Sequence, residues 1–121
     1  MIALPRGVAV FVVHKPVSFG CGIDGMRGYC LSLTKNDPLE KGYFLFINKS
    51  RTQVRVIWYD GQGFALFAKR LSQCRFVHWP RDGECVYSLL ECFQAQGLLF
   101  DGNPHEKNFH PVWKKQPKDL E

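Results

Sequence analysis

Residues 46–80 read FINKSRTQVRVIWYDGQGFALFAKRLSQCRFVHWP, and they are the part of the chain most informative about its fold. Its aromatic and β-branched runs are typical of strands, and turn signals at Ser50-Arg51 and Gly61-Gln62 separate three such runs. Turns as short as these join neighbouring strands into antiparallel hairpins. The sequence therefore predicts an antiparallel β-meander whose Lys and Arg side chains lie on a sheet surface.

The register of the meander follows if both turns contain two residues. Ile47 then lies opposite Val54, and Val56 lies opposite Phe67, so that one face collects core side chains. The other face is too apolar to be fully solvated and too charged to be fully dry, and we expect a helix or a partner to cover part of it. An odd-length first turn would exchange the faces of one strand. The expected core face carries Tyr43, Leu45, Ile47, Val54, Val56, Trp58 and Phe67, and the second face carries Phe44, Phe46, Asn48, Gln53, Arg55, Ile57, Tyr59, Phe64, Leu66 and Arg70.

The segment before the meander predicts a strand and a helix. Residues 8–13 form an apolar run of strand length. Apolar side chains then recur every three or four residues, which predicts a helix from about Gly22 to Thr34. Two glycines weaken this helix, so one of its faces must pack against the sheet. The signal Asn36-Asp37-Pro38 ends it.

The segment after the meander predicts a fourth short strand and a second helix. Residues 75–79 have the composition of a strand, and Pro80 ends it. Residues 88–96 suit a short helix with a stripe of Leu89, Leu90 and Phe93, and Gly97 is the expected stop. We therefore expect an α+β fold with a sheet of about four to five strands and one or two packed helices.

Length and composition limit the organisation of the chain. The 121 residues, 45% of them hydrophobic, suffice for one domain with a real core, which we expect over residues 1–102. Residues 103–121 are polar and broken by prolines, so they predict a flexible tail. No run approaches the ~20 apolar residues of a membrane span, and no membrane partner is expected.

The cysteines and the net charge narrow the classes of function. The five cysteines are an odd number without regular spacing or a Cys-x-x-Cys pair, which predicts reduced thiols in a cytoplasmic protein and no metal or other cofactor. The net charge of +5 fits a nucleic acid or an acidic protein as partner, although ordinary solubility explains it too.

The best candidate nucleic-acid site is a group of cations in and beside the meander. Long basic side chains at a hairpin tip reach outward, and six of them could neutralise several phosphates. An ordinary solvated rim explains the same residues equally well. Nothing resembles a recognition helix, so weak sequence specificity is expected. The group consists of Lys49, Arg51, Arg55, Lys69, Arg70 and Arg75.

The second hairpin supplies the candidate partner-binding residues Tyr59, Asp60, Gln62 and Phe64. Asp60 and Gln62 could contact a partner, although a tight turn in which Asp60 accepts hydrogen bonds from backbone amides explains them more simply. Tyr59 and Phe64 could stack on unpaired bases, but a cross-strand aromatic pair is the simpler interpretation.

Catalytic residues are not indicated. The carboxylates lie at a helix start, a stop signal, a turn and a loop, where Asp is common for local reasons. Cys21 and His14 lack a third group that would orient a nucleophile. We therefore expect no enzyme. The carboxylates considered are Asp24, Asp37, Asp60, Asp82 and Glu84.

The string VIWYDGQGFALFAKRL, residues 56–71, resembles the signature of the TnpB-type (second open reading frame) accessory proteins of the IS sixty-six group of insertion sequences. The opening IALPRGVAVFVV, the segment GIDGM at 22–26 and RFVHWP at 75–80 resemble other parts of that family. The resemblance covers residues 2–102. It departs from the family before residue 22, where FGC replaces a basic stretch, and at the milder hairpin tip of residues 49–51.

The resemblance implies an accessory role in transposition beside a DDE transposase in a bacterial cytoplasm. It brings no settled molecular activity. We expect weakly specific DNA binding together with docking on the transposase or on another element-encoded accessory protein. The alternative is a protein-interaction module that docks on the transposase or forms a homodimer without touching DNA.

Overall fold

The computed structural model describes residues 3–100, which form one five-stranded sheet and two helices. The strands lie in the order β4-β3-β2-β1-β5, and only the β1–β2 pair is parallel. The α+β fold class expected from the sequence is confirmed. The strands are β1 (Val10–Val13), β2 (Tyr43–Ile47), β3 (Gln53–Tyr59), β4 (Phe64–Arg70) and β5 (Tyr87–Leu90).

The predicted meander is confirmed in its topology and its register. Strands β2, β3 and β4 are consecutive and antiparallel, with Ile47 opposite Val54 and Val56 opposite Phe67. The register is fixed by the burial of alternate side chains, because a shift by one residue would move each buried set to the opposite face. The face predicted to be core packs in a single cluster with Phe76, Trp79 and the second helix.

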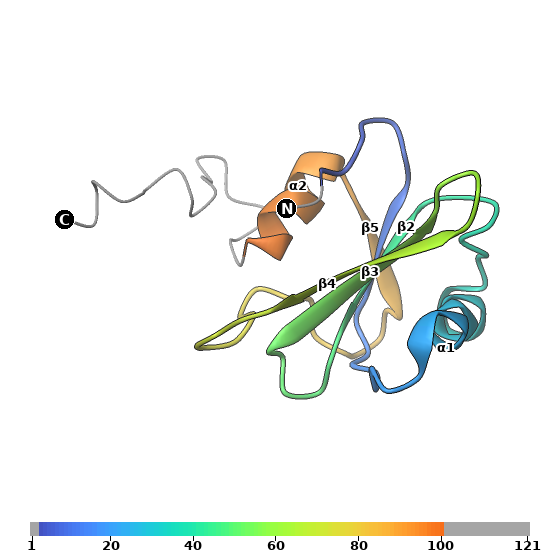
Figure 1. Ribbon diagram of the computed structural model, residues 1–121. Coiled ribbons are helices and arrows are strands. Elements are labelled where there is room, and N and C mark those ends of the chain that lie inside the picture. Colours follow the sequence, from blue (N-terminus) through green and yellow to red (C-terminus); the bar gives the residue numbers. More distant parts are fainter. Residues whose placement is uncertain (1–2, 101–121) are drawn as a thin grey trace.

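The second face of the sheet is covered by the helix that the sequence predicted. This helix is α1 (Gly22–Tyr29), continued by a π-helical turn, η1 (Cys30–Thr34), and Lys35 ends it in the left-handed conformation. Met26 and Cys30 are buried against Phe44 in a second core cluster, which lies on this face of the sheet. Figure 1 shows α1 on one side of the sheet and α2 (Cys92–Leu99) on the other, so the molecule has three layers.

Two predictions after the meander are wrong. Residues 75–79 form no strand; they cross the α2 side of the sheet and bury Phe76 and Trp79. Strand β5 occupies the first residues of the segment predicted as helix, because residues 87–90 pair with β1. Helix α2 begins only after Glu91, whose backbone N–H donates to Gln94 Oε1 (3.1 Å) in a capping box.

The remaining expectations for this segment also differ from the structure. Helix α2 runs through Gly97 to Leu99, so Gly97 is buried inside the helix and is no stop. Leu89 and Phe93 are mostly exposed rather than part of a buried stripe. The tail predicted for residues 103–121 lies outside the described residues.

Candidate nucleic-acid interface

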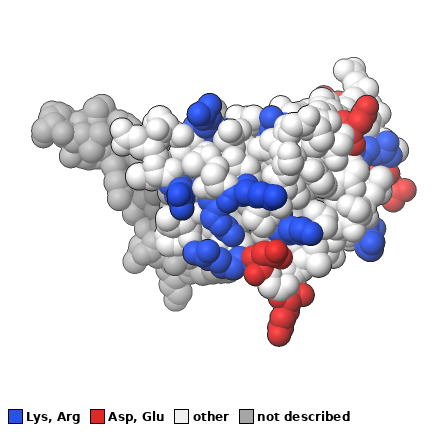
Figure 2. Space-filling model, turned by 90° about the horizontal axis from the view of Figure 1, so that it is seen from below, with Lys and Arg blue, Asp and Glu red and all other residues white. Residues whose placement is uncertain are grey.

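The strand directions bring three separate loops to one end of the sheet. Strands β1 and β2 end there, and β3 starts beside the end of β4. Residues 14–21, 48–52 and 71–86 therefore lie together. We call this region the basic end and define it by Lys15, Lys49, Arg51, Arg70, Arg75 and Arg81. Figure 2 shows Lys and Arg side chains gathered on the side of the molecule that carries these loops, with acidic side chains at the margin.

The turn between β2 and β3 is built by Asn48. Its side-chain Oδ1 accepts hydrogen bonds from the backbone N–H groups of Thr52 (3.0 Å) and Gln53 (3.1 Å). Arg51 adopts the left-handed conformation, with φ of 62°, and its N–H donates to the Asn48 carbonyl. Asn48 thus satisfies backbone donors that the turn would leave unpaired. As a result Lys49 stands exposed at the tip.

The long loop 71–86 is attached to this turn and to β1. The N–H of Phe76 donates to the Arg51 carbonyl (2.8 Å), and the indole Nε1 of Trp79 donates to the Val13 carbonyl (3.0 Å). These bonds are between residues far apart in sequence. They hold exposed Arg75 and Arg81 near the β2–β3 turn.

Positive charges outnumber negative charges at the basic end. Partial burial lowers the pKa of Arg51, and the neighbouring charge of Arg81 lowers it further, whereas Asp82 acts in the opposite direction. Among the described residues of these loops, five cations stand against two carboxylates, Asp82 and Glu84, and Arg70 at the end of β4 adds a sixth positive charge. The summed positive charge attracts anions more strongly than any single pair would.

Four of the six predicted nucleic-acid residues belong to the basic end: Lys49, Arg51, Arg70 and Arg75. The other two have contacts within the fold. The guanidinium of Arg55 lies over the ring of Phe19, 4.8 Å from its centroid. The Lys69 ammonium donates to the Leu99 carbonyl (2.6 Å) near the end of α2.

Sequence reasoning missed Lys15 and Arg81 as members of the group. Lys15 joins it because β1 runs parallel to β2, a pairing between strands about 30 residues apart. Arg81 joins it because Trp79 anchors the loop. A basic residue two positions after the predicted strand 8–13 was the available signal for Lys15. No local signal marks Arg81.

The predicted partner-binding residues lie at the opposite end of the sheet. Tyr59 and Phe64 are paired across β3 and β4, with ring centroids 5.2 Å apart and an edge-to-face angle of 64°. Asp60 Oδ1 accepts hydrogen bonds from the N–H groups of Gln62 (2.9 Å) and Gly63 (3.0 Å), and these bonds lower the pKa of Asp60. The tight turn and the cross-strand pair are confirmed. A seven-residue strand places this tip about 20 Å from the basic end.

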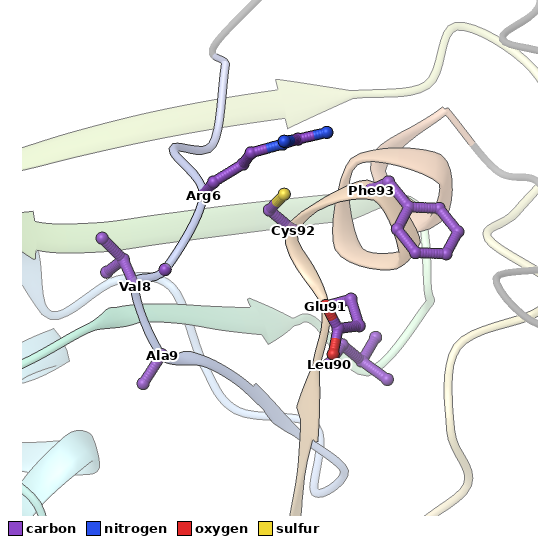
Figure 3. Close-up of a pocket in the computed structure, with 8 residues that line it drawn as sticks. Arg6, Val8, Ala9, Leu90, Glu91, Cys92 and Phe93 are labelled. Carbon is purple, nitrogen blue, oxygen red and sulfur yellow. The ribbon is translucent and has the colours of Figure 1, made fainter.

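A cleft of about 640 Å³ lies at this same far end, between the N-terminal segment and α2. Figure 3 shows Arg6 extending from that segment toward the start of α2, where Cys92 and Phe93 follow Glu91. Leu90 at the end of β5 and Ala9 just before β1 also line this cleft. This cleft is separate from the basic end.

Other kinds of site find little support in the described residues. Within residues 3–100, no three His, Cys, Asp or Glu side chains gather where they could hold a metal ion. All five cysteines fall in this range and are free, and burial raises the pKa of the Cys30 thiol to about 12. Neither described helix has the length and apolar character that crossing a membrane requires.

Comparison with known proteins finds one matching family and two similar bacterial proteins. The model of a family described as "IS66 Orf2 like protein" matches residues 8–107. The chain is 38% identical over 79 residues to the uncharacterized protein y4hO of Sinorhizobium fredii, covering 64% of this chain and 68% of that protein. It is 33% identical over 84 residues to the uncharacterized protein y4jC of the same organism, covering 69% and 72%. No solved structure matches significantly.

Proposed function

This chain belongs to the IS66 Orf2-like family, whose members have accessory roles in transposition, and from this premise we propose that it binds DNA without sequence specificity through the basic end. The proposed role is non-enzymatic, and the proposed setting is the bacterial cytoplasm. A DDE transposase is the proposed protein partner.

The observation that carries the proposal is the convergence of five cations from three loops with Arg70 at the end of β4. Lys15, Lys49, Arg70 and Arg75 are exposed. Each cation that contacts a phosphate releases condensed counterions, which favours binding at low salt. Such contacts position a protein on DNA without reading its sequence.

The two short helices are the reason to expect no sequence specificity. Each α-helix has eight residues and packs on a face of the sheet. Recognition of base edges in a major groove usually requires a helix or a β-ribbon that projects from the body. Neither described helix projects in this way.

The tip of the β3–β4 hairpin, at the far end of the sheet from the basic end, is the proposed docking site for the transposase. Asp60 stabilises its turn by accepting two amide hydrogen bonds, and Gln62 is exposed. Tyr59 and Phe64 add an aromatic pair, a residue type enriched in protein interfaces. Since the tip lies about 20 Å from the basic end, DNA and protein could be bound at the same time.

The experiment is a binding titration of the full chain with duplex and single-stranded DNA of arbitrary sequence over a salt series. We expect similar affinities for unrelated sequences and a steep loss of affinity as salt rises. Absence of binding even at low salt would contradict the proposal.

That negative result would favour the alternative, a protein-interaction module. The observation behind it is the apolar edge at β5, where Leu89 is 61% exposed and Phe93, at the start of α2, is 64% exposed. Edge strands and exposed apolar side chains are common docking sites for other chains, including a second copy. Co-purification with the transposase or formation of a homodimer, without any DNA binding, would support this alternative.

A further inference from the structure

A second cleft lies within the basic end, between the loop that follows β1 and the β2–β3 turn. Its volume is about 450 Å³, which is within the usual range of small-ligand sites. The lining combines one aromatic ring, Phe19, with polar side chains that include Ser18, Lys49 and Gln53. No local sequence pattern connects Phe19 with the β2–β3 turn, which lies about 30 residues later.

The ring of Phe19 is held in place by Arg55 and by packing against the buried cluster on the α1 side of the sheet. The Arg55 guanidinium covers one face of the ring at 4.8 Å from its centroid. Arg55 is fixed by its position on β3, and its buried Nε finds no hydrogen-bond partner among the described residues. A ring already fixed in this way loses little conformational entropy when a ligand stacks on it.

The polar lining suits the rest of a nucleotide. The Gln53 side-chain amide carries both donors and an acceptor, which are the groups needed at the edge of a base. The Lys49 ammonium is exposed at the mouth of the cleft, where a phosphate would be attracted. The positive charge of the surrounding basic end favours a polyanion over a neutral ligand.

We propose that this cleft binds one unpaired base of single-stranded DNA, which stacks on Phe19 while an adjacent phosphate contacts Lys49. The proposal rests on the proposed DNA-binding function and adds a preference for unpaired strands. Bases within a duplex are stacked on their neighbours and cannot enter the cleft. Stacking on an aromatic ring accepts any base, so the cleft would add affinity without sequence specificity.

The test compares Phe19→Leu with wild type, using a short oligothymidylate, a duplex of equal charge and an abasic single strand. Leucine keeps an apolar side chain against the core but cannot stack. We expect the affinity for oligothymidylate to fall about 5- to 150-fold, which corresponds to the loss of one base–aromatic stack. Affinities for the duplex and the abasic strand should stay unchanged. Phe93→Leu, the same change at an exposed ring on α2, is the matched control.

A second variant keeps the test decisive if Phe19→Leu folds poorly. Phe19→Trp retains a stacking ring, and we expect its added fluorescence to be quenched by oligothymidylate but not by the abasic strand. Absence of that quench, or an equal loss for duplex and single strand in Phe19→Leu, would overturn the cleft proposal. If these variants bind every DNA as wild type does, the cleft proposal fails and the DNA-binding function stands. If wild type binds no DNA, both fail.

Discussion

The indole Nε1 of Trp79 donates a hydrogen bond of 3.0 Å to the carbonyl of Val13, which is 66 positions earlier in the chain. This bond joins the 71–86 loop to the end of β1. It thereby brings Arg75 and Arg81 to the same end of the sheet as Lys15. The basic end depends on this tertiary contact as well as on the meander.

Trp79→Phe should lower the free energy of unfolding by about 2–3 kcal/mol. The buried Val13 carbonyl would lose its partner, and the smaller ring would leave a cavity. Chemical denaturation measures the change. Trp58→Phe is the control, because Trp58 is half-buried and stacked on Tyr43 rather than enclosed. An equal loss in both variants would contradict the role given to the Trp79 hydrogen bond.

Lys69 and Arg70 are neighbours in sequence with opposite expected roles. Lys69→Met removes an ammonium that donates to the Leu99 carbonyl at the end of α2, and should cost about 1–3 kcal/mol of stability. It should leave DNA affinity nearly unchanged. Arg70→Met should lower DNA affinity without a loss of stability. Denaturation and DNA titration of both variants check the pair, and a reversed pattern would be incompatible with the assignment.

His14 should make stability depend on pH. Its Nε2 lies 2.6 Å from Ser88 Oγ, and burial is the main cause that lowers its pKa, whereas a backbone hydrogen bond at Cys85 and the charge of Asp82 raise it. The His14 imidazole therefore has a higher pKa in the unfolded chain than in the folded chain. The contribution of neutral His14 to the free energy of unfolding should be fully present above about pH 6.5. It should decrease as the pH drops below that value and should stop decreasing below the pKa of His14 in the folded chain.

The measurement is thermal unfolding from about pH 8 to pH 5, above the range in which ordinary carboxylates titrate. His14→Gln should flatten the dependence. His78→Gln, at an exposed position in the 71–86 loop, should leave it unchanged. A dependence that persists without His14 would exclude this imidazole as its source.

Gly42 precedes β2 with φ of 81°, and a Cβ there would lie 2.8 Å from Phe11 Cε1 and 2.9 Å from the Ala9 carbonyl oxygen. Gly42→Ala should therefore destabilise the protein by at least about 2 kcal/mol, from strain and crowding together. Gly28→Ala, in α1 with open space around the position, should instead stabilise it by up to about 1 kcal/mol. Denaturant midpoints of the two variants should move in opposite directions.

The meander could be predicted because its information is local. Asp60 and Gly61 define the second turn, and the alternation from Val54 to Trp58 then determines which side chains face the core. The same local logic gave the helix at residue 22, since apolar residues at intervals of three and four can share one face of a helix.

The errors concern segments whose structure depends on distant partners. Residues 87–90 have a pattern that suits a helix, but pairing with β1 makes them a strand. Phe76 and Trp79 look like strand residues, yet they are buried by crossing a face of the sheet. The separate roles of Lys69 and Arg70 follow from alternation along β4, whereas the Leu99 acceptor is visible only in the folded chain.

The salt dependence of duplex binding after removal of three exposed cations tests whether the basic end is a DNA interface. Lys49, Arg70 and Arg75 are replaced together by Gln. The control replaces Arg6, Lys35 and Lys41 by Gln, which changes the net charge equally at exposed positions outside the basic end.

In a plot of log Kobs against log salt concentration, the magnitude of the slope should fall by about 2–3 in the basic-end variant, since each lost phosphate contact removes about 0.9. The control should keep the slope of wild type. Equal slopes in the two variants would mean that net charge alone governs binding, and would contradict a DNA interface at the basic end.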